Sequence, residues 1–361
     1  MSILQAIILG IVQGLTEFIP ISSTAHLIFA SRALGLYDGV EQTLRAERTT
    51  ATIAVIQLGT LLAVLIYFAR DIWTISFAFV RDHLALVRGR RSEEAMEMTL
   101  VGKRQTRLSQ EAWLGWLVII GSIPIGTIGL LLKKLIEGPF TKNLWIIATM
   151  MILVAVGLGV AELVGRRKRG MEDLGVRDAL AVGGAQVLAL LPGASRSGST
   201  IMGGLFAGET RETAARFSFL LSIPAIAASG LLELKEALEK LPSDSYGSLV
   251  VATIVSGLVG YASIWFLLRF LRTHSTAIFI GYRMVVGVAI LALLLTGVIN
   301  ATGTGASGPS ETSAPSAPTQ TLPNVAAPTP GSDTGTNNRR QNSVNSSRPT
   351  SRRARSWNEN R

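Results

Sequence analysis

The sequence of 361 residues contains no cysteine, which excludes disulfides, thiol nucleophiles and thiolate metal sites. Charged residues are scarce as well, at 16% of the chain, whereas 48% of the residues are hydrophobic. Only three histidines occur, so a catalytic imidazole has few candidates. A chain this poor in charge and this rich in apolar residues is typical of a membrane protein.

Long uncharged runs recur along the chain and approach the ~20 residues that a helix needs to cross a bilayer. They cover residues 51–69, 113–132, 143–161, 217–232, 248–268 and 284–299. We therefore expect an all-α integral membrane protein with about six transmembrane helices. The apolar N-terminus lacks the basic region of a signal peptide and carries Glu17, so we expect it to be retained.

The formal net charge of +10 comes from loops and the C-terminal tail, so it reports topology and gives no reason to expect a nucleic-acid partner. Residues 70–112 and 165–177 are densely basic, and the positive-inside rule places both in the cytoplasm. The connections at 133–142 and 233–247 then lie outside. With six crossings and neither broken segment crossing the membrane, both termini also lie outside.

Two further apolar segments are too broken to be simple spans. The first hairpin, residues 3–34, is interrupted by Pro20 and a Ser-Ser-Thr run, and the second hairpin, residues 178–208, by Pro192, Gly193 and a Ser-Arg-Ser run. Irregular backbone inside a membrane is tolerated only where protein or a polar cavity surrounds it, so we expect two re-entrant helix-loop-helix hairpins that line a site.

The two hairpins resemble each other, because Gln13, Pro20 and Ser23 parallel Gln186, Pro192 and Ser195. Three spans follow each hairpin, and an odd number of crossings turns the second copy upside down. We therefore predict a membrane domain over 1–299 built from two inverted repeats, about 1–164 and 165–299. Residues 300–361 are rich in Ser, Thr, Pro and Arg and poor in apolar residues, which predicts a disordered tail.

The first hairpin places Gln13 and Glu17 one helical turn apart, followed by Ser22, Ser23, Thr24 and His26. A carboxylate in an apolar hairpin is energetically unfavourable, so Glu17 is a candidate functional residue. The alternative is that Glu17 pairs with an arginine only to hold the two hairpins together. The Ser-Ser-Thr hydroxyls can bind a ligand or simply cap the next helix. His26 is the plausible catalytic imidazole, because His83 and His274 fall in or beside predicted loops.

The second hairpin carries Arg196 between Ser195 and Ser197, with Thr200 one turn further along. A guanidinium flanked by hydroxyls at a helix N-terminus favours a phosphate ligand, while Glu17 is the alternative anion. Two helix N-termini meeting in mid-membrane would form a cradle for a diphosphate, with Glu17 as base, His26 as acid or orienting group and Arg196 stabilising the transition state.

The runs at 13–26 (Gln-Gly-Leu-Thr-Glu-Phe-Ile-Pro-Ile-Ser-Ser-Thr-Ala-His) and 192–200 (Pro-Gly-Ala-Ser-Arg-Ser-Gly-Ser-Thr) resemble the two signatures of the undecaprenyl-diphosphatase, or bacitracin-resistance, family. Matches at 56–59 and 217–224 extend the resemblance to about residue 299 and leave the tail outside it. The family carries Glu or Gln at the position of Gln13, and the uncharged variant stands here.

The resemblance implies hydrolysis of undecaprenyl diphosphate to the monophosphate, which recycles a lipid carrier of cell-wall synthesis and confers bacitracin resistance. It assigns catalytic roles to Glu17, Ser23, His26 and Arg196, in a cell-membrane protein whose site opens to the outer face. Ser23 as a nucleophile and Ser23 as a residue that positions water both fit the sequence. A divalent cation such as Mg or Ca would be held mainly by the substrate, since no protein-only metal site is evident. The expected partners are the lipid substrate and the bilayer, and a homodimer is compatible with the sequence.

Two rival functions need consideration. A polyprenyl-phosphate transporter or flippase would share the inverted repeats, the broken helices and the ionisable groups in mid-membrane. The Ser-Arg-Ser and Glu-His groupings favour hydrolysis over transport. An acid-phosphatase-type lipid phosphatase would require two catalytic histidines, and this sequence offers one candidate.

Overall fold

The computed structural model describes residues 1–88, 108–132, 143–241 and 245–300. Over these residues the chain is helical and forms no strand. They belong to one compact unit, Met1–Pro309. The predicted tail at 300–361 lies outside the described residues except for Asn300.

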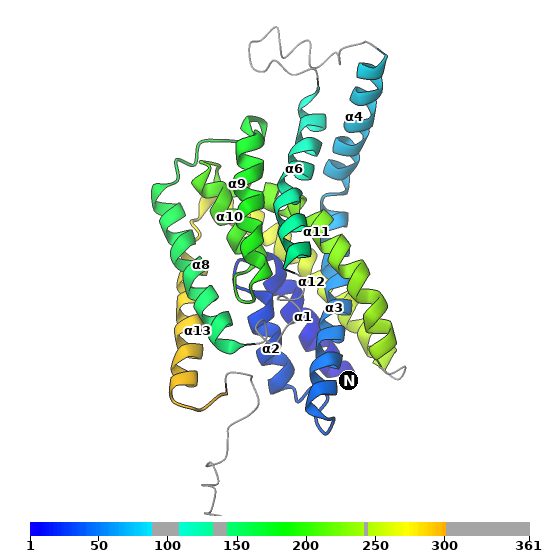
Figure 1. Cartoon of the computed structure of the whole chain (residues 1–361), viewed down its shortest axis with the longest axis vertical. Coiled ribbons are helices and arrows are strands. Elements are labelled where there is room, and N and C mark those ends of the chain that lie inside the picture. Colours follow the sequence, from blue (N-terminus) through cyan, green and yellow to red (C-terminus); the bar gives the residue numbers. More distant parts are fainter. Residues whose placement is uncertain (89–107, 133–142, 242–244, 301–361) are drawn as a thin grey trace, which may run out of the picture. The chain divides into compact units, whose positions relative to one another are not determined.

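The described helices follow one another with short connections (Figure 1). The first half contains α1 (Ile3–Phe18), α2 (Ser23–Ala33), α3 (Gln42–Tyr67), α4 (Ala69–Val87), α6 (Gln110–Leu131) and α8 (Leu144–Val164). The second half contains the 3-10 turn η2 (Met171–Asp173), α9 (Val176–Gln186), the 3-10 turn η3 (Val187–Leu190), α10 (Arg196–Phe206), α11 (Arg211–Lys240), α12 (Tyr246–Thr273) and α13 (Ala277–Leu295).

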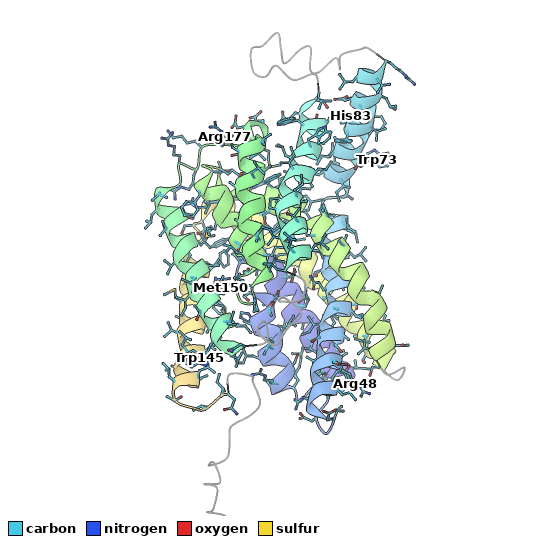
Figure 2. All side chains as sticks on the ribbon, in the orientation of Figure 1. Arg48, Trp73, His83, Trp145, Met150 and Arg177 are labelled. Atoms are coloured by element: carbon cyan, nitrogen blue, oxygen red, sulfur yellow. The ribbon has the colours of Figure 1, made fainter. Side chains whose placement is uncertain are left out.

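Five helices in the described part of the chain are long and apolar enough to cross a membrane. These candidate spans are Glu47–Tyr67, Gln110–Leu131, Leu144–Val164, Tyr246–Thr273 and Ala277–Leu295. Large apolar side chains are exposed along the outside of the molecule, among them Trp73 at 74% and Trp145 at 38% (Figure 2). Such a surface requires an apolar covering, so the chain is a multi-pass membrane protein.

Two sequence predictions about helix limits were wrong. The run at 70–112 was predicted as a loop, but α4 occupies 69–87 and leaves only Phe68 between α3 and itself. The last span was predicted to begin at 284, whereas α13 begins at Ala277 and includes Arg283. The predicted span at 217–232 lies within α11, which is not among the five candidates.

Both predicted hairpins are helix-turn-helix units. α1 ends at Phe18, because Ile19 is extended and Pro20 follows it, and the residue before a proline avoids helical geometry. In the second hairpin, the chain passes from α9 through η3 and a turn at 191–195 into α10. The two hairpins enter the bundle from opposite ends and their turns approach each other near its centre (Figure 1).

The helix contacts form matching sets in the two halves of the chain. α1 packs on α12 as α9 packs on α6, and α3 contacts α12 as α11 contacts α6. α3 also packs on α11, and α8 on α13. Glycines permit the close crossings: a Cβ on Gly183 would overlap the carbonyl oxygen of Gly121, and one on Gly14 would lie 2.8 Å from the carbonyl oxygen of Ser256.

The central apolar cluster connects the first hairpin to the second half of the chain. Phe18, at the end of α1, packs edge-on against Phe219 of α11 with ring centroids 5.5 Å apart. Ile201 of α10 and Ile264 of α12 belong to the same buried cluster. This core fixes the end of α1, and with it Glu17, relative to α10 and α11.

Candidate functional site

Both hairpin turns place a serine in an unusual backbone conformation directly before a helix. Ser22 has a φ of 79° before α2, and Ser195 has a φ of 66° before α10. Such angles are costly for residues other than glycine and are concentrated at functional sites. The backbone therefore pairs Ser22 with Ser195, so the predicted correspondence of Ser23 with Ser195 is off by one residue.

The two serines use their hydroxyls differently. Ser195 Oγ accepts a hydrogen bond from the backbone N–H of Gly198 at 3.2 Å and so caps α10. It also lies 3.2 Å from Ser197 Oγ. Ser22 Oγ is buried and has no partner among the described residues. α2 therefore begins without a side-chain cap on its first N–H groups.

A carboxylate and a guanidinium connect the two hairpins. Arg196 Nη2 donates to Glu17 Oε1 at 3.0 Å, and both side chains are largely buried. Gln13 Nε2 donates to Glu17 Oε2 at 3.2 Å and also lies 3.4 Å from Thr60 Oγ1. Gln13 and Glu17 thus lie on the same face of α1, and Arg196 makes the ion pair with Glu17 that the sequence left as an alternative.

Two polar atoms beside the Arg196–Glu17 ion pair make no hydrogen bond to the described residues. Arg196 Nη1 and Gln13 Oε1 are buried and have no hydrogen-bond partner within the described residues. A buried polar atom without a partner costs about 1–3 kcal/mol, so such atoms gather where a ligand or water completes the bonding. The second guanidinium nitrogen is therefore free to bind an anion while the first stays on Glu17.

His26 is held at both ring nitrogens. Its Nδ1 lies 2.7 Å from the carbonyl oxygen of Ser22, which can only accept, so Nδ1 carries a proton. Its Nε2 lies 2.7 Å from the hydroxyl of Tyr282 on α13. In the neutral ring Nε2 is the acceptor, so Tyr282 donates to it. The imidazole is thereby oriented beside the first turn.

Arg283, also on α13, binds the backbone of both turns. It is fully buried, and its Nη2 donates to the carbonyl oxygens of Gly193 and Ala194 at 3.0 Å each. Its Nη1 lies 3.4 Å from the carbonyl oxygen of Pro20, and its Nε donates to the carbonyl oxygen of Met151 at 3.2 Å. One guanidinium therefore joins the first hairpin, the second hairpin and α8.

The four remaining predicted residues differ in their surroundings. Ser23 is the first residue of α2, half-buried, and its hydroxyl makes no hydrogen bond to any described residue. Thr24 is exposed. Ser197 is buried close to Ser195. The hydroxyl of Thr200 is bonded to the carbonyl oxygen of Arg196 and to Ser218, so it holds α10 against α11.

Sequence reasoning missed Arg283 and Tyr282. Spans were drawn as uncharged runs, so a charged residue was taken as the end of a helix. The missed signal was an arginine with apolar residues on both sides, from Ile278 to Leu295, because a charge inside such a helix needs a specific set of partners.

The electrostatics of the junction suit a polyanion. Arg196, Arg283 and the N-termini of α2 and α10 all contribute positive potential, whereas Glu17 is the acidic group beside them. No group of three His, Cys, Asp or Glu side chains that could hold a metal ion occurs within the described ranges.

Comparison with known proteins places these features in a family. A family model described as bacitracin resistance protein BacA matches residues 6–289. A protein of Syntrophobacter fumaroxidans named undecaprenyl-diphosphatase is 52% identical over 291 residues, which are 81% of this chain and 97% of that protein. Proteins of the same name from Prosthecochloris aestuarii and Mycolicibacterium vanbaalenii are 44% and 46% identical, over 83% of this chain and all of each relative. The signatures predicted from 13–26 and 192–200 fall within the matched residues, and the chain belongs to the bacitracin resistance protein BacA family.

Proposed function

We propose that this protein hydrolyses undecaprenyl diphosphate to undecaprenyl phosphate and inorganic phosphate at the junction of the two hairpins. The relatives named undecaprenyl-diphosphatase, similar over nearly their whole length, supply the substrate and reaction. The observation that carries the assignment is Arg196, which keeps one guanidinium nitrogen on Glu17 and a second, buried nitrogen free at the N-terminus of α10. The reaction recycles the lipid carrier of cell-wall synthesis and accounts for bacitracin resistance.

In the proposed mechanism, Arg196 and the N-terminal N–H groups of α2 and α10 bind the terminal phosphoryl group and stabilise its charge in the transition state. Glu17 removes the proton from the hydroxyl of Ser23, whose oxygen attacks the terminal phosphorus and breaks its bond to the bridging oxygen. The lipid phosphate departs as an anion, and His26 orients the reacting groups beside the first turn. Water then attacks the phosphorus of the phosphoserine and breaks its bond to the Ser23 oxygen, which takes back its proton from Glu17, while the protons of the water remain on the inorganic phosphate that is released. Gln13, Ser22, Thr24, Ser195, Ser197 and Thr200 are proposed to contact the substrate or shape its cradle.

A divalent cation is part of the proposal as a companion of the substrate. Glu17 is a single carboxylate and already bonds Arg196, so the diphosphate would supply most of the ligands. When bound, the cation neutralises charge on the diphosphate.

The proposed membrane arrangement has α11 as a sixth crossing and both hairpins as re-entrant segments. The matching contacts of α1 with α12 and of α9 with α6 support two inverted repeats. The hairpins approach from opposite ends, as inversion requires (Figure 1). With residues 165–177 in the cytoplasm, the site opens towards the outer face.

Phosphate release by the purified protein in detergent tests the function. An enzyme releases phosphate from a polyprenyl diphosphate without a membrane gradient, whereas a flippase of the same architecture does not. Glu17→Gln should lower kcat by roughly a hundred-fold or more and leave substrate binding in place, since general base catalysis contributes on that order. Glu172→Gln, at an exposed carboxylate in η2, is the matched control. Normal turnover in Glu17→Gln would refute the proposed base.

A further inference from the structure

The turn of the second hairpin has a cap of its own, whereas the turn of the first hairpin has none. Both turns contain a serine with a positive φ, which is unfavourable for a residue other than glycine and persists only where the surroundings hold it. Ser195 is held by its own hydroxyl, which accepts a hydrogen bond from the backbone N–H of Gly198. The Oγ of Ser22 makes no hydrogen bond to a described residue. Other groups must therefore hold the first turn.

His26 provides one of these groups from within α2. Ser22 precedes α2 and offers its carbonyl oxygen to the backbone N–H of His26, but this bond is long at 3.4 Å. The imidazole Nδ1 of the same residue lies 2.7 Å from that oxygen and makes the shorter bond. The side chain of His26 thus closes the first turn of α2 and fixes the carbonyl group of Ser22. Ser23, the proposed nucleophile, is the next residue in the chain.

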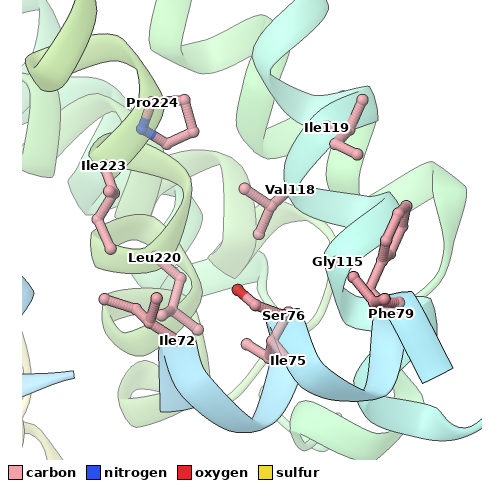
Figure 3. Close-up of a pocket in the computed structure, with 11 residues that line it drawn as sticks. Ile72, Ile75, Ser76, Phe79, Gly115, Val118, Ile119, Leu220, Ile223 and Pro224 are labelled. Carbon is pink, nitrogen blue, oxygen red and sulfur yellow. The ribbon is translucent and has the colours of Figure 1, made fainter. Parts of the chain in front are cut away.

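Tyr282 of α13 holds the imidazole from the other side. Its hydroxyl lies 2.7 Å from Nε2 of His26, and the two rings are stacked, with centroids 5.6 Å apart and planes inclined by 14°. The next residue, Arg283, lies 3.4 Å from the carbonyl oxygen of Pro20, so α13 reaches the first turn at two consecutive positions. An apolar pocket of about 360 Å³ between α4, α6 and α11 is lined by none of these residues, so these contacts are independent of it (Figure 3).

We propose that Tyr282 is a positioning residue for the hydrolysis and acts through His26. Tyr282 holds the imidazole, the imidazole holds the carbonyl group of Ser22, and the turn fixed in this way presents the hydroxyl of Ser23 to the terminal phosphorus. The inference rests on the proposed function, in which Ser23 is the attacking group. Because Tyr282 acts on the alignment of the nucleophile and not on the bound diphosphate, its loss affects kcat and leaves KM in place.

Tyr282→Phe tests the inference, because it keeps the stacked ring and removes only the hydroxyl. We expect kcat for undecaprenyl diphosphate to fall by roughly ten-fold and KM to stay within about two-fold, with little change in Tm. The matched control is Tyr261→Phe on α12. Tyr261 is exposed to a similar degree, 45% against 43%, and its ring packs on Tyr67, but its hydroxyl makes no hydrogen bond to a described residue. The control should match the unsubstituted protein.

Two further measurements show whether the effect passes through His26. Diethyl pyrocarbonate modifies a free nitrogen of the neutral imidazole, and the hydroxyl of Tyr282 occupies Nε2. Modification of His26, followed by mass spectrometry, should therefore be several-fold faster in Tyr282→Phe and unchanged in Tyr261→Phe. In a double-mutant cycle, Tyr282→Phe should lower kcat by less than about two-fold in the His26→Ala background, because the group on which it acts is already absent.

Undiminished kcat in Tyr282→Phe, or a change confined to KM, would overturn the positioning role. So would a full ten-fold loss of kcat added to that of His26→Ala, since roughly additive effects indicate residues that act independently. Failure of the unsubstituted protein to release phosphate from any polyprenyl diphosphate would instead refute the proposed function.

Discussion

At the scale of single residues, the pairing of Arg196 with Glu17 joins two alternatives that the sequence left open. The guanidinium is planar and has several donors in fixed directions, so it can keep Nη2 on the carboxylate and present Nη1 to a phosphate. One side chain can therefore serve both the ion pair and the proposed phosphate site. Ser195 and Ser197 flank Arg196 in the sequence at the start of α10.

Lysine at position 196 separates these two functions. Arg196→Lys retains the charge and can still pair with Glu17, but all its donors lie on one nitrogen, so it lacks the second, coplanar donor nitrogen. We expect kcat to fall by roughly a hundred-fold or more, as when one preorganised oxyanion donor is removed, with little change in Tm. Turnover assays and thermal unfolding on the same preparation check this. A lysine variant with most of the wild-type activity would favour a purely structural pair.

Glu209 predicts a pH dependence of stability outside the hairpin junction. Its carboxyl group is fully buried and has no hydrogen-bond partner among the described residues. Burial raises its pKa to about 8, and the nearby Asp178 adds to the rise while Arg169 opposes it. The folded state therefore binds the proton more tightly than the unfolded state.

The sign of the effect follows from that difference. Stability is fully present below the usual pKa of about 4.5 and falls as the pH rises towards 8, by at most about 1.4 kcal/mol per pH unit. The Tm should therefore decrease between about pH 5 and pH 8, and the decrease should be much smaller in Glu209→Gln. Equal pH profiles of Tm for the two proteins would contradict the assignment to Glu209.

At the scale of elements, both broken segments could be predicted from the sequence, because proline, glycine and serine interrupt otherwise apolar runs and end a helix there. The turns occur at 19–22 and 191–195, as Pro20 and Pro192 indicated. α4 was missed because its basic residues, such as Arg70 and Arg81, were taken as a loop signal, whereas Ile72, Ile75 and Phe79 recur at helical spacing. Contacts such as Arg283 with both turns depend on tertiary packing, which residue spacing does not reveal.

The crossing of α6 and α9 can be tested with two neighbouring glycines. Gly183→Ala places a methyl group against the carbonyl of Gly121, so it should force the helices apart and destabilise the protein by about 1–3 kcal/mol. Gly184→Ala meets nothing within 4 Å and should be neutral or slightly stabilising, since alanine favours helix. Thermal unfolding of both variants distinguishes them, and a shared effect would rule out the close crossing as its cause.

Arg283 controls the relative position of the two turns. Arg283→Lys keeps the charge but offers its donors from a single nitrogen, which cannot reach carbonyls of Pro20, Gly193 and Met151 together. We expect kcat to fall by roughly ten-fold or more and the Tm to fall as well, since unsatisfied carbonyls are left in the core. Arg272→Lys, at an exposed ion pair with Glu212, is the control. Unchanged kcat in Arg283→Lys would exclude a positioning role.

At the scale of the whole molecule, the absence of cysteine makes the proposed topology directly testable. Gly247→Cys lies at the exposed start of α12, on the proposed outer side, and Glu172→Cys lies in exposed η2, on the proposed cytoplasmic side. In intact cells an impermeant thiol reagent should label the first and leave the second unlabelled until the membrane is permeabilised. The opposite pattern would invert the arrangement and place the site on the inner face.

Arg283 also has a consequence for the order in which the protein becomes active during synthesis. Its donors lie on α13, the last described helix, while the carbonyls that they bind lie in turns made much earlier. Until that helix has been translated and inserted, neither strained turn has this support. A nascent chain that already contains both signature motifs would therefore remain without a finished site, and activity would begin only when membrane insertion is complete.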